Sequence, residues 1–213
     1  MKIYLNESSP FARLVLAVAI ELGVKDIDLE WTDPWSCPKD LLAVNPFSTI
    51  PVLVLDDGTS LQESLFISRY LMDNAGRHGQ NSSPMVDKTD AGALARGSTG
   101  KSLMEVAFRR VVLDRFSPEG EGLRDRASDA LSRVLSTIRP GEVPSVESKV
   151  QFSELCLVIA LLYVRFRLRE DFDRYVSEEV QSWLRSWERR VSVHKTDPAS
   201  LASKPSSVSG LVA

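Results

Sequence analysis

The sequence predicts two domains of different class, an α/β domain followed by an all-helical domain. Strand patterns and helix patterns alternate only as far as residue 76, and after a polar segment no convincing strand occurs while apolar residues recur at helical spacing. We therefore expect an α/β domain over residues 1–76, a linker over 77–88 and a helical domain over 89–213.

The first domain begins with a strand, a helix and a second strand. Strands are expected over residues 2–6 and 27–31, with a helix over 9–22 between them. Ser9 is a good N-cap and Pro10 suits the first helical position, so the start of this helix is well marked. Two strands joined through a helix should pair in parallel, with a right-handed crossover.

The rest of the first domain is predicted to contain a hairpin between two helices. A short helix, two strands and a longer helix are expected over residues 39–44, 52–55, 60–61 and 63–75. Asn45-Pro46 ends the short helix, because a residue before proline avoids helical geometry, and Asp57-Gly58 is a strong hairpin signal. The order βαβ, α, ββα is the thioredoxin-like arrangement.

The remainder of the chain is predicted to be helical. Residues 77–87 (RHGQNSSPMVD) are polar and without periodicity, as expected of a linker. Helices are expected over residues 89–116, 123–138, 146–169 and 177–193, with the charged segment REDFDRY forming a corner between the last two. The tail from Thr196 onward is expected to be poorly packed.

The charge and hydropathy of the chain exclude several classes of partner. The net charge of -3 arises from 26 basic and 29 acidic residues without a block of one sign, so the sequence predicts neither nucleic-acid binding nor binding to an anionic membrane. The longest apolar run, residues 155–164, is far short of the roughly 20 residues that span a bilayer. No export signal is recognisable, so we expect a cytoplasmic protein with small-molecule or protein partners.

The cysteines and histidines are too few for a metal site. The chain has Cys37 and Cys156, with His78 and His194. Cys156 lies in an apolar run and is expected to be a buried small hydrophobe, whereas Cys37 lies in a Trp- and Pro-rich loop as either an unremarkable loop thiol or a catalytic thiol.

Four segments in this order resemble the cytosolic glutathione transferases. They are SSPFARLVLAVAIELGV at residues 8–24, NPFSTIPVLVLDDG at 45–58, LQESLFISRYL at 61–71 and SELCLVIALLYVRFRLREDFDRY at 153–175. Each motif is weak alone, but the ordered combination is specific. The last segment is similar to the bacterial and fungal branch, in which the core helix of the second domain ends in Tyr-x-x-Phe-Arg.

The resemblance implies a glutathione site in the first domain. A cis-proline at Pro51 would turn the main chain of Ile50 outward, so that it pairs with glutathione as a strand does; from the sequence alone, Pro51 can equally be a proline that starts a strand. Ser64 and the helix N-terminus would take the γ-glutamyl carboxylate, and Glu63 its ammonium group; a plain helix start is the alternative. Lys39 is the candidate ligand of the glycyl carboxylate.

The resemblance to serine-type members places thiolate stabilisation on Ser9. A free thiol has a pKa of about 8.5, so a donor beside the sulfur raises the fraction of thiolate at neutral pH. Ser8 is the alternative donor, and a simple helix cap is the structural alternative for Ser9. Serine before Pro10 argues against thiol-disulfide chemistry. Arg13, one turn further on, either adds positive potential or extends from a buried helix toward solvent.

Residues of the second-substrate pocket are less clearly marked, and two motifs depart from the family pattern. The candidates for the pocket are Phe11, Trp35, Met104 and Phe108, although aromatic and Met side chains at helical spacing are more often core. The loop before Pro51 has Ser48 where the family usually has glycine. The core helix of the second domain has Gln151 and Glu154 where a Ser/Thr cap and an aspartate are usual, which predicts a weaker capping box.

We therefore expect an enzyme that uses glutathione as co-substrate and attacks a hydrophobic electrophile, in detoxification or secondary metabolism. Two alternatives remain open: a glutathione-assisted isomerase, eliminating enzyme or cyclase in a specialised pathway, and a non-catalytic binding protein of transferase fold. The resemblance also implies a homodimer.

Overall fold

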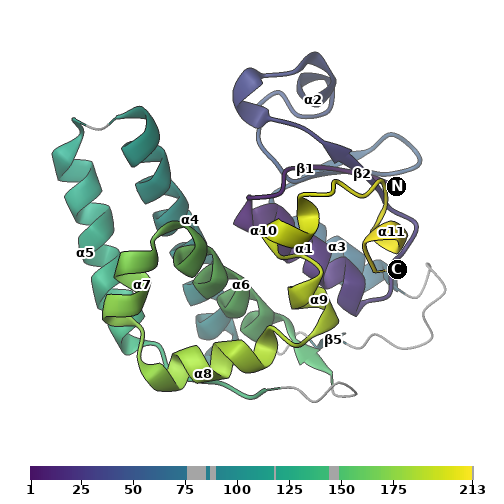
Figure 1. The fold of residues 1–213 in the computed structure, drawn as a ribbon. Helices are drawn as coiled ribbons and strands as arrows, with labels where there is room; N and C mark the ends of the chain where they lie inside the picture. Colours follow the sequence, from purple (N-terminus) through teal and green to yellow (C-terminus); the bar gives the residue numbers. More distant parts are fainter. Residues whose placement is uncertain (76–84, 87–89, 118, 144–148, 213) are drawn as a thin grey trace. The chain divides into compact units, whose positions relative to one another are not determined.

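The computed structural model describes residues 1–75, 85–86, 90–117, 119–143 and 149–212. The chain forms two compact units, one made of residues 1–86 together with 190–213, and the other of residues 87–189 (Figure 1). We call them the first unit and the second unit and describe each by itself. The predicted linker 77–88 lies outside the described residues except for β5 (Met85–Val86).

The first unit contains a four-stranded sheet in the order β2-β1-β3-β4. Its strands are β1 (Lys2–Leu5), β2 (Asp28–Trp31), β3 (Val52–Val54) and β4 (Ser60–Gln62). β1 and β2 are parallel, as predicted for a strand-helix-strand connection, and the other two neighbouring pairs are antiparallel. Val52 is opposite Tyr4 in β1 and Gln62 in β4, so the strand that follows Pro51 lies inside the sheet.

Helices cover both faces of this sheet. They are α1 (Pro10–Glu21), the 3-10 turn η1 (Pro34–Ser36), α2 (Lys39–Val44) and α3 (Ser64–Asn74). In Figure 1, α1 and α3 pack against each other below the sheet and α2 lies above it. Gly23 ends α1 with a φ of 67°. Its N–H donates a hydrogen bond to the Ile20 carbonyl, and the Val24 N–H donates one to the Ala19 carbonyl. The thioredoxin-like arrangement predicted from the sequence is confirmed.

The end of the chain belongs to the first unit, which differs from the predicted helical domain over 89–213. Its helices are α9 (Val191–His194), α10 (Pro198–Leu201) and α11 (Val208–Val212). The Leu29 N–H donates to the Ser206 carbonyl at 2.8 Å and the Val208 N–H donates to the Ile27 carbonyl at 2.9 Å, so this segment covers the free edge of β2. Leu201 is also buried. The expectation of a poorly packed tail is therefore wrong.

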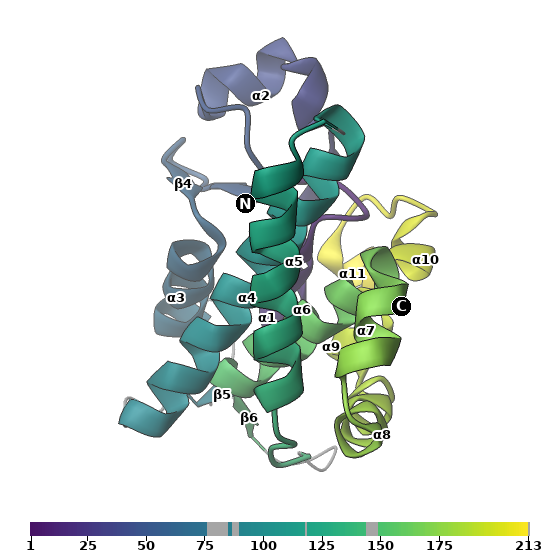
Figure 2. The ribbon, with the colours of Figure 1, turned by 90° about the vertical axis from the view of Figure 1, so that its left-hand side faces the viewer.

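The second unit is helical, as predicted. It contains α4 (Ala91–Phe116), α5 (Glu121–Thr137), β6 (Val150–Gln151), α6 (Phe152–Arg167), α7 (Arg169–Tyr175) and α8 (Glu178–Trp187). α6 forms the core of the unit, because residues 155–164 are all buried, and α4 packs against both α6 and α5 (Figure 2). Among the helices described, none is both long and apolar enough to cross a membrane.

Two predicted helix bounds in the second unit change. α6 ends at Arg167, since Leu168 leaves helical geometry, and the charged corner that follows is itself the helix α7. At the start of α6, the Gln151 side chain makes no capping bond, which confirms the weaker cap. Glu154 forms an ion pair with Arg96 of α4 instead of closing a capping box.

Candidate functional site

Ser9 lies at the start of α1 as its N-cap. Its Oγ accepts a hydrogen bond from the Ala12 N–H at 3.2 Å, and its own N–H donates to the Asn6 side chain at 2.8 Å. Within the described residues the hydroxyl proton of Ser9 has no acceptor, and the residue is only partly buried. Ser9 is therefore a helix cap whose hydroxyl still has a hydrogen bond to donate.

Ser8 lies beside it, in the turn before α1. Its N–H donates to the same Asn6 oxygen at 3.2 Å, and within the part of the chain that the structure describes its hydroxyl has no partner. Asn6 was not singled out from the sequence, although an Asn two or three residues before a helix cap is a common turn former. It fixes the main chain of both serines.

The Ile50–Pro51 peptide bond is cis, as the resemblance implied. Ile50 is only partly buried, and in the described parts of the chain its N–H and C=O make no hydrogen bond. A main-chain donor and acceptor without partners can pair with an extended peptide.

The loop that leads to this bond is held by side chains. Asn45 is completely buried, and its amide Nδ2 donates to the Thr49 carbonyl at 2.8 Å while its Oδ1 accepts from the Phe47 N–H at 3.1 Å. Ser48 has a φ of 49°, and its hydroxyl donates to the Pro34 carbonyl at 2.8 Å. Asn45 was identified from the sequence only as a helix end, so its role as the support of this loop was missed.

Ser64 is the first residue of α3, and Glu63 is its N-cap. The Ser64 side chain is buried, and its Oγ has no hydrogen-bonding partner in the described structure. Glu63 is exposed, adopts a φ of 65° and makes no side-chain cap. A buried hydroxyl without a partner is costly, and this one is able to form a hydrogen bond with a polar ligand.

The main chain adds to this feature. The first described bond of α3 is from the Ile67 N–H to the Glu63 carbonyl, so the N–H groups of Ser64 and Leu65 make no hydrogen bond to any described residue. These N–H groups and the positive end of the helix dipole favour an anion. α3 is eleven residues long, so its dipole places a partial positive charge at the N-terminus beside Ser64.

The loop between β2 and α2 is open to solvent. Lys39 is exposed at the start of α2, Trp35 is 48% exposed, and Cys37 is an exposed free thiol in the left-handed region with a φ of 47°. Cys37 is thus an exposed thiol in a loop, and the alternatives of a loop thiol and a catalytic thiol both stay open.

The other pocket candidates differ in exposure. Phe11 is partly buried at the start of α1, and in the second unit Phe108 is 36% exposed whereas Met104 is completely buried. Met104 therefore has the core environment that a methionine at helical spacing most often has.

Two buried titratable groups in the second unit take no part in the candidate site. Burial raises the pKa of the Cys156 thiol to about 12, which makes it the inert hydrophobe that was predicted. Burial also raises the pKa of Tyr163 to about 12, against the influence of Arg167. Among the described residues no group of His, Cys, Asp and Glu side chains could hold a metal ion.

Comparison with known proteins agrees with this geometry. Residues 8–74 match the family described as glutathione S-transferase, N-terminal domain, and this range contains every candidate residue from Ser8 to Ser64. No curated protein matches the chain. A glutathione transferase family member from Pseudomonas fluorescens Pf-5 with bound glutathione is 22% identical with a TM-score of 0.79, over 92% of this chain and 98% of its own.

The fold is that of the glutathione transferases. A glutathione S-transferase from Methylobacterium radiotolerans in complex with glutathione sulfonate is 18% identical, covering 92% of this chain and 94% of its own with a TM-score of 0.69. Gtt2 from Saccharomyces cerevisiae is also 18% identical, covering 92% of this chain and 100% of its own with a TM-score of 0.61. The family match covers residues 8–74, and over the rest of the chain these structures show a shared fold.

Proposed function

We propose that this protein is a serine-type glutathione transferase of the bacterial and fungal branch, which activates the thiol of glutathione for attack on a hydrophobic electrophile. The observation that supports the proposal most is the buried Ser64 hydroxyl without a partner, at a helix end whose first N–H groups are also unpaired. The relatives solved with bound glutathione point to the same ligand.

Each end of the tripeptide has a partner in the first unit. The γ-glutamyl carboxylate binds the Ser64 hydroxyl and the N–H groups at the start of α3, and Glu63 accepts from its ammonium group. The cysteinyl main chain pairs with the N–H and C=O of Ile50, next to Pro51. Lys39 takes the glycyl carboxylate.

Ser9 then stabilises the thiolate. The thiol gives its proton to solvent, and the Ser9 hydroxyl donates a hydrogen bond to the sulfur anion while its oxygen accepts one from the Ala12 N–H. Because the thiolate is favoured over the thiol, the pKa of bound glutathione falls below about 8.5. The thiolate attacks the electrophilic carbon, a C–S bond forms and the leaving group departs with its electron pair.

The central test combines calorimetry with glutathione and kinetics of Ser9→Ala. We expect Ser9→Ala to bind glutathione as the wild type does and to lose roughly 100-fold in kcat with a halogenated nitrobenzene as electrophile. Ser8→Ala should retain the wild-type kcat. If instead Ser8→Ala loses kcat and Ser9→Ala retains it, the thiolate is stabilised by Ser8. An unchanged rate in both variants, or no binding of glutathione to the wild type at millimolar concentration, contradicts the proposal.

A matched control separates chemistry from helix capping. Ser177 caps α8 as Ser9 caps α1, accepting from the Val180 N–H at 3.3 Å. Ser177→Ala should therefore cost about 1 kcal/mol of stability, as Ser9→Ala does, while leaving kcat unchanged. A stable thioether product supports conjugation, whereas a product of unchanged mass points to the isomerase alternative.

We also propose that the protein is a homodimer. Phe47 and Phe66 are 75% and 73% exposed on the first unit, and large exposed aromatic side chains are typical of interfaces. Sedimentation at micromolar concentration should give a dimer that Phe66→Ala weakens, and a monomer at all concentrations contradicts this proposal.

A further inference from the structure

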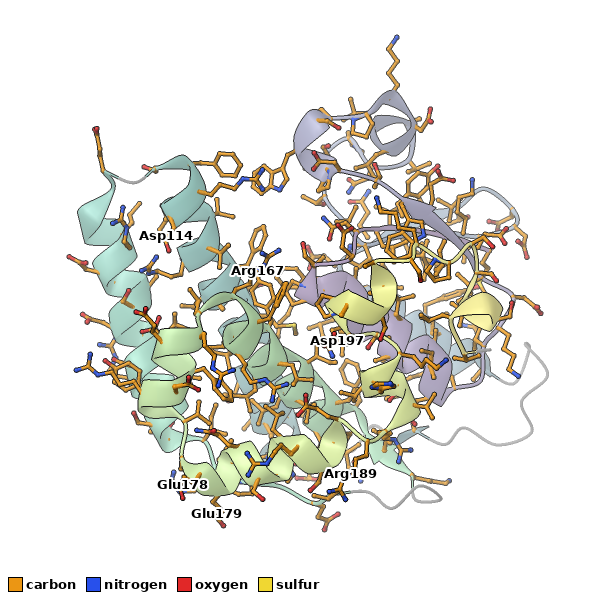
Figure 3. The ribbon with its side chains drawn as sticks, in the orientation of Figure 1. Asp114, Arg167, Glu178, Glu179, Arg189 and Asp197 are labelled. Carbon is orange, nitrogen blue, oxygen red and sulfur yellow. The ribbon has the colours of Figure 1, made fainter. Side chains whose placement is uncertain are left out.

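Arg13 of α1 is a buried arginine whose contacts are with the end of the chain. Its side chain is 6% exposed; Nη2 donates to the Val193 carbonyl at 3.0 Å and Nε donates to the Thr196 hydroxyl at 3.4 Å. Asp197, which is labelled in Figure 3, places a carboxylate oxygen 3.7 Å from Nη2. Arg13 therefore does not extend to solvent, and its charge is neutralised by the C-terminal segment, residues 190–212.

The acceptors of Arg13 are themselves held in place. Thr196 is completely buried, and its hydroxyl donates to the Ser192 carbonyl at 2.6 Å while accepting from Arg13. Asp197 caps α10 by accepting from the Ala199 N–H at 3.0 Å. The guanidinium therefore binds a preformed set of oxygens, which a planar fork of donors matches well.

The main chain of Arg13 connects this anchor to Ser9. The Arg13 N–H donates to the Ser9 carbonyl at 3.0 Å, in the same turn where the Ala12 N–H donates to the Ser9 hydroxyl. A shift of Arg13 therefore disturbs two of the hydrogen bonds that orient Ser9, while the third, from the Ser9 N–H to Asn6, lies outside this turn.

We propose that Arg13 is a positioning residue, which fastens the first turn of α1 to the C-terminal segment and so sets the place of the Ser9 hydroxyl. The inference rests on the proposed function, in which that hydroxyl faces the sulfur of glutathione. A displacement of the order of 1 Å at a catalytic donor costs up to about 100-fold in rate, so small changes at Arg13 have measurable consequences.

The other end of α1 provides a matched control. Glu21 is bound to the same segment by Arg190, whose Nε and Nη2 donate to its two carboxylate oxygens at 2.6 and 2.8 Å, and by Ser192. Glu21→Gln breaks a partly buried ion pair between α1 and the C-terminal segment, three turns away from Ser9. It therefore reproduces the loss of an anchor without touching the first turn.

The experiment measures kcat, the KM for glutathione, the pH profile of kcat/KM and amide exchange at positions 12 and 13 in wild type, Arg13→Met and Glu21→Gln. We expect Arg13→Met to lose about tenfold in kcat, to shift the apparent thiol pKa upward and to exchange faster at both amides, with the KM changed less than about twofold. Glu21→Gln should keep the wild-type pH profile. Arg13→Lys takes the place of Arg13→Met where the latter does not fold, because lysine keeps the charge but not the fork.

The outcomes distinguish this inference from the proposed function. A pH profile and amide exchange of Arg13→Met that coincide with those of wild type overturn the positioning role, even in an active transferase. Equal changes in Arg13→Met and Glu21→Gln also overturn it, because they indicate general loosening of the segment. A wild type that binds no glutathione overturns the proposed function, and faster exchange at positions 12 and 13 in Arg13→Met alone then still establishes that Arg13 orders the first turn.

Discussion

Gly100 marks the closest approach of α4 to α6, and replacing it with alanine tests how the second unit is packed. A Cβ added at Gly100 would lie 2.7 Å from the Leu157 nitrogen and 2.8 Å from both the Cys156 carbonyl carbon and the Leu157 Cα. These are main-chain atoms in the middle of α6, so they cannot turn aside as a side chain does. Favourable contacts need about 3.5–4.0 Å, so the two helices must separate by roughly 1 Å.

Two opposing effects set the size of the change. Alanine in a helix interior is favoured over glycine by about 0.5–1 kcal/mol, because an unfolded chain with alanine has less conformational entropy to lose on folding. Overpacking of a filled core costs about 1–3 kcal/mol, and here it lies against residues 155–164, which are all buried. We expect Gly100→Ala to lower the free energy of unfolding by about 1–2 kcal/mol, measured by urea denaturation followed by circular dichroism.

Gly97, one turn earlier in α4, is the matched control. Its added Cβ would lie 3.4 Å from the nearest atoms, the Cα and Cβ of Ser153, which is close to ordinary contact. Gly97→Ala should therefore be neutral or raise stability by up to about 1 kcal/mol. A Gly100→Ala protein as stable as Gly97→Ala refutes the close approach of the two helices.

Three further predictions concern single side chains. Ser48→Ala keeps a positive φ and loses a hydrogen bond, so urea denaturation should show a loss of about 1 kcal/mol, whereas Ser48→Gly relieves the strain and should cost less. Burial raises the pKa of Glu154 against the opposing effect of Arg96, so the folded state binds its proton more readily than the unfolded chain. This stabilisation is present at low pH and is lost as the pH rises through the raised pKa. Glu154→Gln should therefore remove the fall in stability that begins above the ordinary glutamate pKa. A thiol reagent at about pH 8 should modify Cys37 and leave Cys156 intact, as read by mass spectrometry.

Local signals were sufficient to predict most of the first unit. The Ser9 cap, the Gly23 end of α1 and the Asp57-Gly58 turn each depend on residues close in sequence, and each occurs in the structure as predicted. The cis bond before Pro51 also occurs as predicted, but that prediction came from the family resemblance and not from the local sequence pattern.

Features that depend on distant partners were not predictable in this way. α7 has seven residues, too few for a helical period to show, and it is held by one buried side chain, Phe172. The C-terminal segment has isolated apolar residues among Ser and Pro, and they are buried because the segment packs against α1 and along the edge of β2. Arg13 resembles any arginine on an apolar helix until Val193 and Thr196 are seen beside it.

The loop before Pro51 shows how a departure from a family pattern can be compensated. Serine stands at position 48, where the family usually has glycine, and this difference predicts a changed loop. In the structure Ser48 has a φ of 49°, a conformation that glycine adopts at lower cost. The Ser48 hydroxyl offsets this cost by bonding the Pro34 carbonyl, and Asn45 holds the Thr49 carbonyl from the other side. Side chains rather than a glycine thus fix this loop, and the Ile50–Pro51 bond that follows it is still cis. Under the proposed function, this loop positions the main chain of Ile50 for glutathione. Ser48→Ala should therefore raise the KM for glutathione more than it lowers kcat, whereas a loop that serves other chemistry predicts the reverse.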